Sequence, residues 1–157
     1  AMLAPTFSKV GLSLSALNEA YFLDERELQS LARHPLVSIG GHTDSHAALS
    51  CLDIQSARAE MADNRSYLER LLQRPVRHFA YPYGDSKACG PREAQLARDI
   101  GFSTAVTTRH GQLSGLKSDH FALPRLGVGG QFDTTARFEA RISGVQSAAH
   151  MLLGSQR

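Results

Sequence analysis

Helical patterns alternate with short β-rich runs along this chain of 157 residues, and this alternation limits the folds that it can adopt. The residues up to Leu23 show little pattern and are expected to form a loop. From Asp24 onward the expected order is helix, strand, helix, strand, helix, strand, strand and helix. This order predicts an α/β fold in which parallel strands are joined by helical crossovers.

Each expected helix has a start or stop signal in the sequence. Asp24 and Glu27 form a capping-box pattern, and Pro91 suits the first position of a helix. In the last helix, Phe138 and Ile142 are expected to face inward. The helices are expected to start at Asp24, Asp53, Pro91 and Asp133, and the first three to end near Pro35, Gln73 and Ile100.

The expected strands are short apolar runs bounded by glycine or proline. Leu36 to Ile39 is β-branched in part and is followed by Gly40 and Gly41, which indicates a buried strand. The remaining strands are expected at 76–81, 102–108 and 123–128.

Composition excludes several classes of protein. Apolar residues make up 42% of the chain and charged residues 20%, which argues against global disorder. The net charge of +2 is spread along the chain, so a nucleic-acid-binding face is not indicated and a weakly charged ligand such as a sugar polymer fits better. No apolar run is long enough to span a membrane, and the first residues do not resemble a signal peptide. Cys51 and Cys89 are expected to be reduced thiols, although spacing alone leaves a disulfide open.

Two polar clusters follow directly after expected strands, at 41–46 and 81–85. The carboxyl ends of parallel strands share one rim of a sheet, so the two clusters are expected to meet there. Histidine is a common ligand of zinc, and His42 and His46 are spaced so that both can point at one ion. The alternative is that both histidines are exposed and bind nothing.

The same segments resemble the motifs of a known family. Ile39 to His46 resembles the H-[ST]-x-x-H metal motif of polysaccharide deacetylases, the NodB-homology group or carbohydrate esterase family 4. Phe79 to Gly84, FAYPYG, resembles the third motif of that family, and Leu123-Pro124-Arg125 follows in the expected order. The resemblance covers about residues 24–130. It implies a partial distorted (β/α) barrel and a hydrolase that removes acetyl groups from N-acetylated, sometimes O-acetylated, sugars of a polysaccharide.

The resemblance also implies roles for single residues. His42 and His46 would be two ligands of a divalent metal, most often Zn²⁺, and the metal would activate the attacking water. Tyr83 would line the sugar groove, with its backbone amide as an oxyanion donor, and Tyr81 would bind the substrate beside it. The alternative for both tyrosines is a place in the core.

The chain departs from the family pattern at several positions. It contains no Asp-Asp pair, which in the family supplies the third metal ligand and the general base. Ala80 stands where many members carry an arginine, and Arg125 is hypothesised to replace it. No clear counterpart of the family's acid histidine is present, and His110 and His120 are expected in a surface loop.

The simplest interpretation of these departures is a single deacetylase domain, residues 1–157, that is truncated at its N-terminus and inactive as it stands. The alternative is a carbohydrate-binding relative without catalysis, and a chain with idle histidines is a third. An incomplete barrel would expose strand edges, so self-association is expected. Family members often act on envelope or secreted polysaccharides, and a targeting segment would lie upstream of Ala1.

Overall fold

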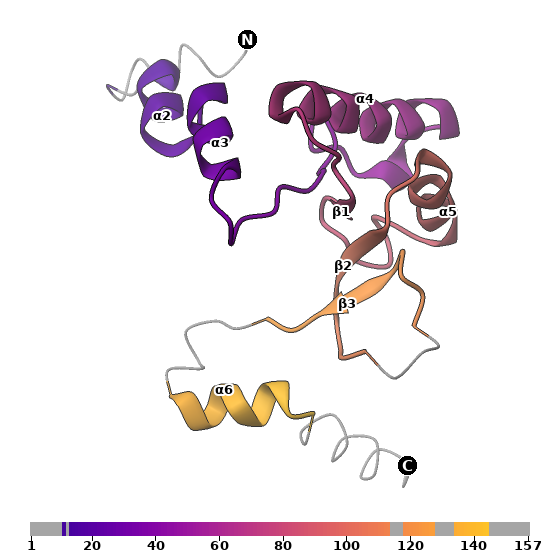
Figure 1. Ribbon diagram of the computed structural model, residues 1–157. Coiled ribbons are helices and arrows are strands. Elements are labelled where there is room, and N and C mark those ends of the chain that lie inside the picture. The colour runs from indigo at the N-terminus through magenta and orange to yellow at the C-terminus, as the bar shows by residue number, and fades with distance from the viewer. Residues whose placement is uncertain (1–10, 12, 114–117, 128–133, 145–157) are drawn as a thin grey trace, which may run out of the picture.

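The centre of the structure is a small parallel sheet. The computed structural model describes residue 11 and residues 13–113, 118–127 and 134–144 (Figure 1). Three parallel strands lie in the order β1-β2-β3, and Gly41 adds a single parallel bridge to Phe79 of β1. The strands are β1 (His78–Ala80), β2 (Thr104–His110) and β3 (Leu123–Arg125). Because the order in the sheet follows the order in the chain, the arrangement is that of a segment of a (β/α) barrel, and the expected α/β fold is confirmed.

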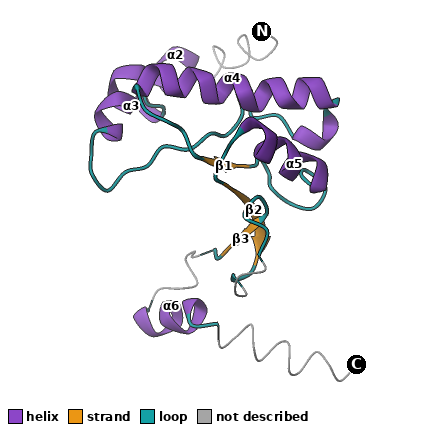
Figure 2. Cartoon of the chain, turned by 45° about the vertical axis from the view of Figure 1, so that its right-hand side comes forward, coloured by secondary structure: helices purple, strands orange, loops and turns teal. Residues whose placement is uncertain are grey.

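Helices α4 (Ile54–Leu72) and α5 (Pro91–Ile100) lie on the same side of β1 (Figure 2). The first connects the Gly41 bridge to β1, and the second connects β1 to β2, so both are crossover helices. Asp53 caps α4 by accepting hydrogen bonds from the backbone N–H groups of Gln55 and Ser56. Gln73 and Gly101 end the two helices in the left-handed conformation. Both helices therefore match the bounds expected from their caps.

Two further helices precede the sheet. Helix α3 (Glu25–Ala32) begins at the predicted capping box, in which Asp24 and Glu27 each accept a backbone N–H of the other. Helix α2 (Leu14–Tyr21) lies where a loop was expected, so that prediction is wrong. Its cap is Ser13, whose hydroxyl accepts from the N–H of Ala16 at 3.3 Å. A short 3-10 helix, η1 (Leu49–Cys51), precedes α4.

The strand expected at 36–39 does not form, because the chain leaves α3 in a turn. The N–H of Val37 donates to the carbonyl of His34, and 89% of Leu36 is exposed. Strand pairing begins only at Gly41, whose N–H donates to the carbonyl of His78 at 2.8 Å. Gly41 makes two hydrogen bonds to β1. In the described residues, this isolated bridge takes the place of a fourth strand beside β1.

The last helix, α6 (Thr135–Ile142), is capped by Thr134, whose side chain accepts from the N–H of Arg137. The cap expected at Asp133 lies outside the described residues. Phe138 is 41% exposed and Ile142 48% exposed, so the prediction that both face inward is wrong. In Figure 1 this helix lies apart from α4 and α5, below the sheet, so it has little core to cover.

The core lies between the sheet and the two crossover helices. Phe79 of β1 contacts the rings of Tyr81 and Phe102, with centroids 5.2 and 5.0 Å apart. Helix α4 contributes Met61, and α5 contributes Leu96. Burial of these side chains is what attaches the helices to the sheet.

Cys51 is exposed and Cys89 is buried, and both are free thiols, as expected. Burial raises the pKa of the Cys89 thiol, which keeps it protonated. Among the described residues, no strand pairs with the outer side of β3. Self-association through such an edge stays a prediction. No helix in the described part of the chain is both long and apolar enough to cross a membrane.

We expect Gly84→Ala to destabilise the turn that follows β1 by about 1–3 kcal/mol. Gly84 has a φ of +64°, and a Cβ there would lie 2.7 Å from the backbone nitrogen of Thr108 on β2. Urea denaturation would measure the loss. The control is Gly127→Ala, because a Cβ at Gly127 meets nothing within 4 Å; equal stability of both variants would contradict the prediction.

Candidate functional site

The segment from His42 to His46, here called the histidine loop, begins at the carboxyl end of the sheet. The N–H of Ala80 donates to the carbonyl of Gly41 at 2.9 Å, which places His42 beside the last residue of β1. Gly40 is needed for a close approach, because a Cβ at that position would lie 2.9 Å from the carbonyl oxygen of His78. His42 therefore lies at the rim where parallel sheets bind their ligands.

The structure brings His42, His46 and Tyr83 together, although they come from two separate segments. The imidazole rings of His42 and His46 are 4.8 Å apart between centroids and nearly perpendicular, at 77°. The ring of Tyr83 lies 5.1 Å from that of His46. The two polar clusters, at 41–46 and 81–85, thus lie together on one surface.

The hydrogen bond of His42 decides which ring nitrogen is available. Nδ1 lies 2.7 Å from the carbonyl oxygen of Ala80. A carbonyl only accepts, so Nδ1 carries the proton and donates it. The lone pair of the neutral ring is then on Nε2, the nitrogen that remains free for a ligand. Metal-binding histidines commonly orient themselves through such a hydrogen bond from the second nitrogen.

The histidine loop has an unusual backbone. Thr43 and His46 have φ values of +67° and +59°. The left-handed conformation is a clear outlier for a β-branched residue, and it costs on the order of 1–3 kcal/mol. The Thr43 side chain is also buried, with 5% exposed, and its hydroxyl oxygen has no hydrogen-bond partner among the described residues. Strain and an unpaired buried hydroxyl persist only where surrounding contacts enforce them, and they are typical of functional loops.

Two residues of α4 supply those contacts, and no motif in the sequence pointed to them. The Asn64 side-chain oxygen accepts from the N–H of His42, and the Glu60 carboxylate accepts from the N–H groups of Asp44 and Ser45. These hydrogen bonds, those to Ser45 above all, lower the pKa of Glu60 and keep it ionised. The only signal in the sequence is the four-residue spacing of two polar side chains on one helix face.

The two tyrosines of the Tyr81-Pro82-Tyr83 segment face opposite ways. Tyr81 is 2% exposed, and its hydroxyl donates to the carbonyl of Phe121 at 2.8 Å. Burial raises the pKa of this hydroxyl and keeps it neutral. Tyr83 is 60% exposed. Tyr81 therefore lies in the core, which was the alternative to substrate binding in the sequence analysis. Of these two tyrosines, only Tyr83 is accessible to a sugar.

Other residues considered in the sequence do not join the histidines. Arg125 ends β3, and its Nε donates to the carbonyl of Thr107 at 2.7 Å. His110 ends β2, contrary to the expected loop, and its Nδ1 lies 3.1 Å from Arg141. His120 is exposed. Asp85 accepts from the N–H groups two and three residues ahead, so it holds the turn after Tyr83.

The described residues offer two nitrogen ligands and no more at this place. No group of three or more His, Cys, Asp or Glu side chains that could hold a metal occurs in the described part of the chain. The available Nε2 of His42 and its proximity to His46 suit a divalent cation that takes further ligands from elsewhere.

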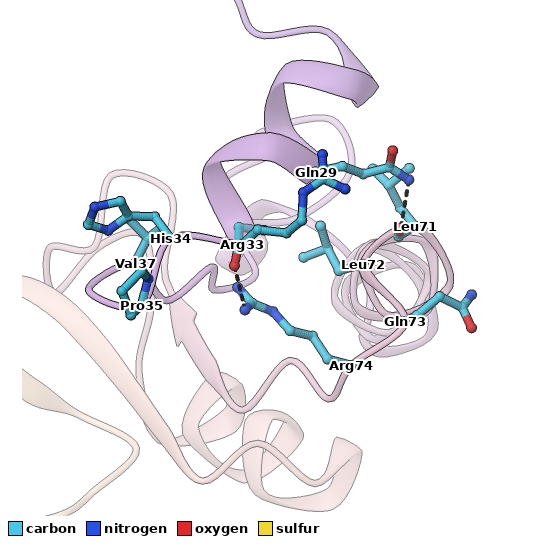
Figure 3. Close-up of a pocket in the computed structure, with 10 residues that line it drawn as sticks. Gln29, Arg33, His34, Pro35, Val37, Leu71, Leu72, Gln73 and Arg74 are labelled. Carbon is cyan, nitrogen blue, oxygen red and sulfur yellow. Dashed lines mark hydrogen bonds between the residues drawn. The ribbon is translucent and has the colours of Figure 1, made fainter.

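Two hollows differ in their relation to this rim. One of about 280 Å³ lies beside Tyr83 and is lined by Ala48, Ser50, Cys51, Tyr83, Asp85, Lys87 and Ala88. Another, of about 470 Å³, lies between the C-terminal ends of α3 and α4 (Figure 3). It is crossed by hydrogen bonds from Gln29 to Leu71 and from Arg74 to Ala32. The larger hollow contains neither histidine of the loop, and we attribute it to the packing of two helix ends.

Comparison with known proteins identifies the family. The family described as "Polysaccharide deacetylase" matches residues 14–105, more than half of the chain, so the chain belongs to the polysaccharide deacetylase family. The resemblance seen in the sequence is thereby confirmed. No curated protein sequence matches the chain.

Solved structures of similar fold include two proteins that are named as deacetylases, and a third named IcaB. A Streptococcus pyogenes deacetylase, PplD, in complex with acetate is 22% identical with a TM-score of 0.61, over 80% of this chain and 57% of that one. A polysaccharide deacetylase from Bacillus cereus is 21% identical with a TM-score of 0.66, over 76% and 36%. IcaB from Ammonifex degensii is 20% identical with a TM-score of 0.60, over 75% and 53%. This chain thus spans between about a third and somewhat over half of each of these proteins.

We expect Tyr81→Phe to lower the free energy of unfolding by about 1–2 kcal/mol, because the carbonyl of Phe121 loses its buried donor. Tyr83→Phe serves as the control. Its ring is largely exposed, so stability should change by less than about 0.5 kcal/mol. Thermal or urea unfolding measures the stability of both variants. A larger loss of stability in Tyr83→Phe than in Tyr81→Phe would contradict the assignment of Tyr81 to the core and Tyr83 to the surface.

Proposed function

We propose that this chain carries the metal-binding and sugar-binding part of a metal-dependent hydrolase that removes acetyl groups from the N-acetylated, or O-acetylated, sugars of a polysaccharide. For N-acetyl groups, the reaction class is hydrolysis of carbon–nitrogen bonds other than peptide bonds. The observation that carries the proposal is the meeting of His42, His46 and Tyr83 at the carboxyl end of a parallel sheet. Membership of the deacetylase family supports it.

The two histidines are proposed as ligands of one divalent cation, with Zn²⁺ favoured because the donors are imidazole nitrogens. The hydrogen bond to the Ala80 carbonyl orients the ring of His42 and leaves Nε2 as the nitrogen that would hold the ion. When bound, such an ion polarises the acetyl carbonyl and activates water. A carboxylate ligand and a general base would come from outside the residues that the structure describes, so the described residues alone are proposed to be inactive.

Tyr83 is proposed to bind the sugar and to assist the reaction. Its exposed ring beside His46 offers an apolar face to a pyranose, and the 280 Å³ hollow next to it leaves room for a sugar unit. Its backbone N–H makes no hydrogen bond within the described residues, whereas its carbonyl accepts from the Thr108 hydroxyl. A fixed, unpaired N–H at this position suits an oxyanion.

Arg125 is the second residue proposed to take part in catalysis. It lies at the carboxyl end of β3, on the same rim as Tyr83, and is exposed. Its Nε bond to Thr107 uses one edge of the guanidinium and leaves other donors available. Its proposed role is to take the place of the arginine that many family members carry where this chain has Ala80.

The second candidate function is a carbohydrate-binding relative without catalysis. It is favoured by the fact that the described residues supply only two metal ligands, while the exposed Tyr83 needs no metal to stack on a sugar. The two candidates differ in whether sugar binding depends on the histidines.

For the metal, we expect Zn²⁺ to bind with one ion per chain in calorimetry. His42→Ala and His46→Ala should each weaken the affinity by at least about tenfold, because each removes a ligand. His78→Ala is the control, since this exposed histidine of β1 is hydrogen bonded to Thr104 instead. Equal affinities for all four proteins would contradict the assignment of the ligands.

For the substrate, we expect saturation-transfer NMR with an oligomer of N-acetylglucosamine to show contact with the acetyl methyl group. The contact should strengthen when Zn²⁺ is added and should fall in the His42→Ala/His46→Ala variant, because the ion draws the acetyl carbonyl toward the histidines. A contact that persists without the ion and in the double variant, yet is lost in Tyr83→Ala, would favour the carbohydrate-binding alternative. Measurement of acetate in the same samples tests whether the chain is inactive, as proposed. Release of acetate by the original chain, but not by the double variant, would contradict the proposed inactivity.

A further inference from the structure

Glu60 and Asn64 lie one turn apart on α4 and together hold the backbone of the histidine loop. The Glu60 Oε2 atom accepts from the N–H groups of Asp44 and Ser45 at 3.0 and 2.9 Å, and Oε1 accepts from the Ser45 hydroxyl at 2.7 Å. Asn64 accepts from the N–H of His42 at 3.0 Å. The backbone on both sides of Thr43 is therefore bound from one rigid helix.

These contacts act at the strained part of the loop. Thr43 lies between the residues bound by Asn64 and Glu60, and its left-handed backbone is unfavourable for a β-branched side chain. Without the helix contacts, the loop would gain stability by moving Thr43 and His46 toward ordinary backbone angles. Such a movement would change the distance and angle between the two imidazole rings.

We infer that Glu60 and Asn64 are positioning residues that set the relation of His42 to His46 before any ion binds. The inference rests on the proposed function in so far as the rings are metal ligands, but the loop contacts exist without a metal. Ligands held in place beforehand bind an ion more tightly, because less conformational freedom is lost on binding.

The chemistry of Glu60 suits this task better than that of its neutral analogue. A carboxylate accepts at both oxygens, so it serves two N–H groups and one hydroxyl together. In Glu60→Gln the amide oxygen can still accept from the two N–H groups, and the Ser45 hydroxyl can turn to accept from the new NH₂ group. The hydrogen bonds lose their charge and become weaker. Glu60→Ala removes them all.

The matched control lies on the same helix. The Glu69 Oε1 atom accepts from the N–H of Val76 and from Arg65, both at 3.0 Å, so it also holds a loop to α4. That loop leads into β1 and is not the histidine loop. Glu69→Ala therefore tests loss of stability without release of the histidines.

The experiment measures amide hydrogen exchange and Zn²⁺ affinity on the whole chain. In the absence of metal, the Asp44 and Ser45 amides should exchange at least about tenfold faster in Glu60→Ala than in the original chain, with Glu60→Gln between them. Zn²⁺ affinity should fall by about tenfold to a hundredfold in the same order. Glu69→Ala should leave both quantities unchanged once exchange is corrected for global unfolding.

The outcomes separate the positioning role from the metal site itself. If the original chain binds no Zn²⁺, the proposed metal site fails, and the metal-free exchange rates still decide whether Glu60 holds the loop. Unchanged exchange in Glu60→Ala, or equal effects of Glu69→Ala, would overturn the inference. Faster exchange with unchanged Zn²⁺ affinity would also overturn it, since the loop would then be held for a reason unrelated to the histidines.

Discussion

The site depends on the pair of hydrogen bonds that Gly41 makes with His78 and Ala80 of β1. They are the only strand pairing in the described segment before α4, yet they fix the point at which the backbone reaches the rim of the sheet. His42 follows at once and uses the same Ala80, through its carbonyl, to orient its ring. One residue of β1 thus positions both the backbone and the side chain of the first histidine.

The parts of the fold that could be predicted from the sequence are those with local causes. Asp53 and Pro91 set the starts of two helices, and a cap needs only neighbouring residues to form. The strand expected at 36–39 failed because a strand needs a partner, and the chain after α3 turns before it can pair. Helix α2 was missed although Ser13 caps it and Leu14, Leu17 and Tyr21 recur at helical spacing. It adds no side chain to the buried core among the described residues, and Tyr21 at its end is 78% exposed.

The candidate site divides in the same way. His42 and His46 could be found because their spacing, and their place after an expected strand, are both local features of the sequence. Glu60 could not be found, since its contacts cross 15 and 16 residues and a glutamate within a helix is ordinary in sequence. The choice between Tyr81 and Tyr83 also required the structure, because two aromatic residues around a proline look alike until their burial is known.

Pro82 lies between these tyrosines and is itself fully buried, with its φ fixed by the ring. The backbone that carries Tyr83 is therefore anchored on one side by the buried Tyr81-Pro82 pair, and on the other by Gly84 against β2. In its proposed binding role, Tyr83 would adjust to different ligands only by rotation about its side-chain bonds. A side chain on such a rigid backbone would favour ligands whose shape already fits it, and it would lose little conformational entropy on binding.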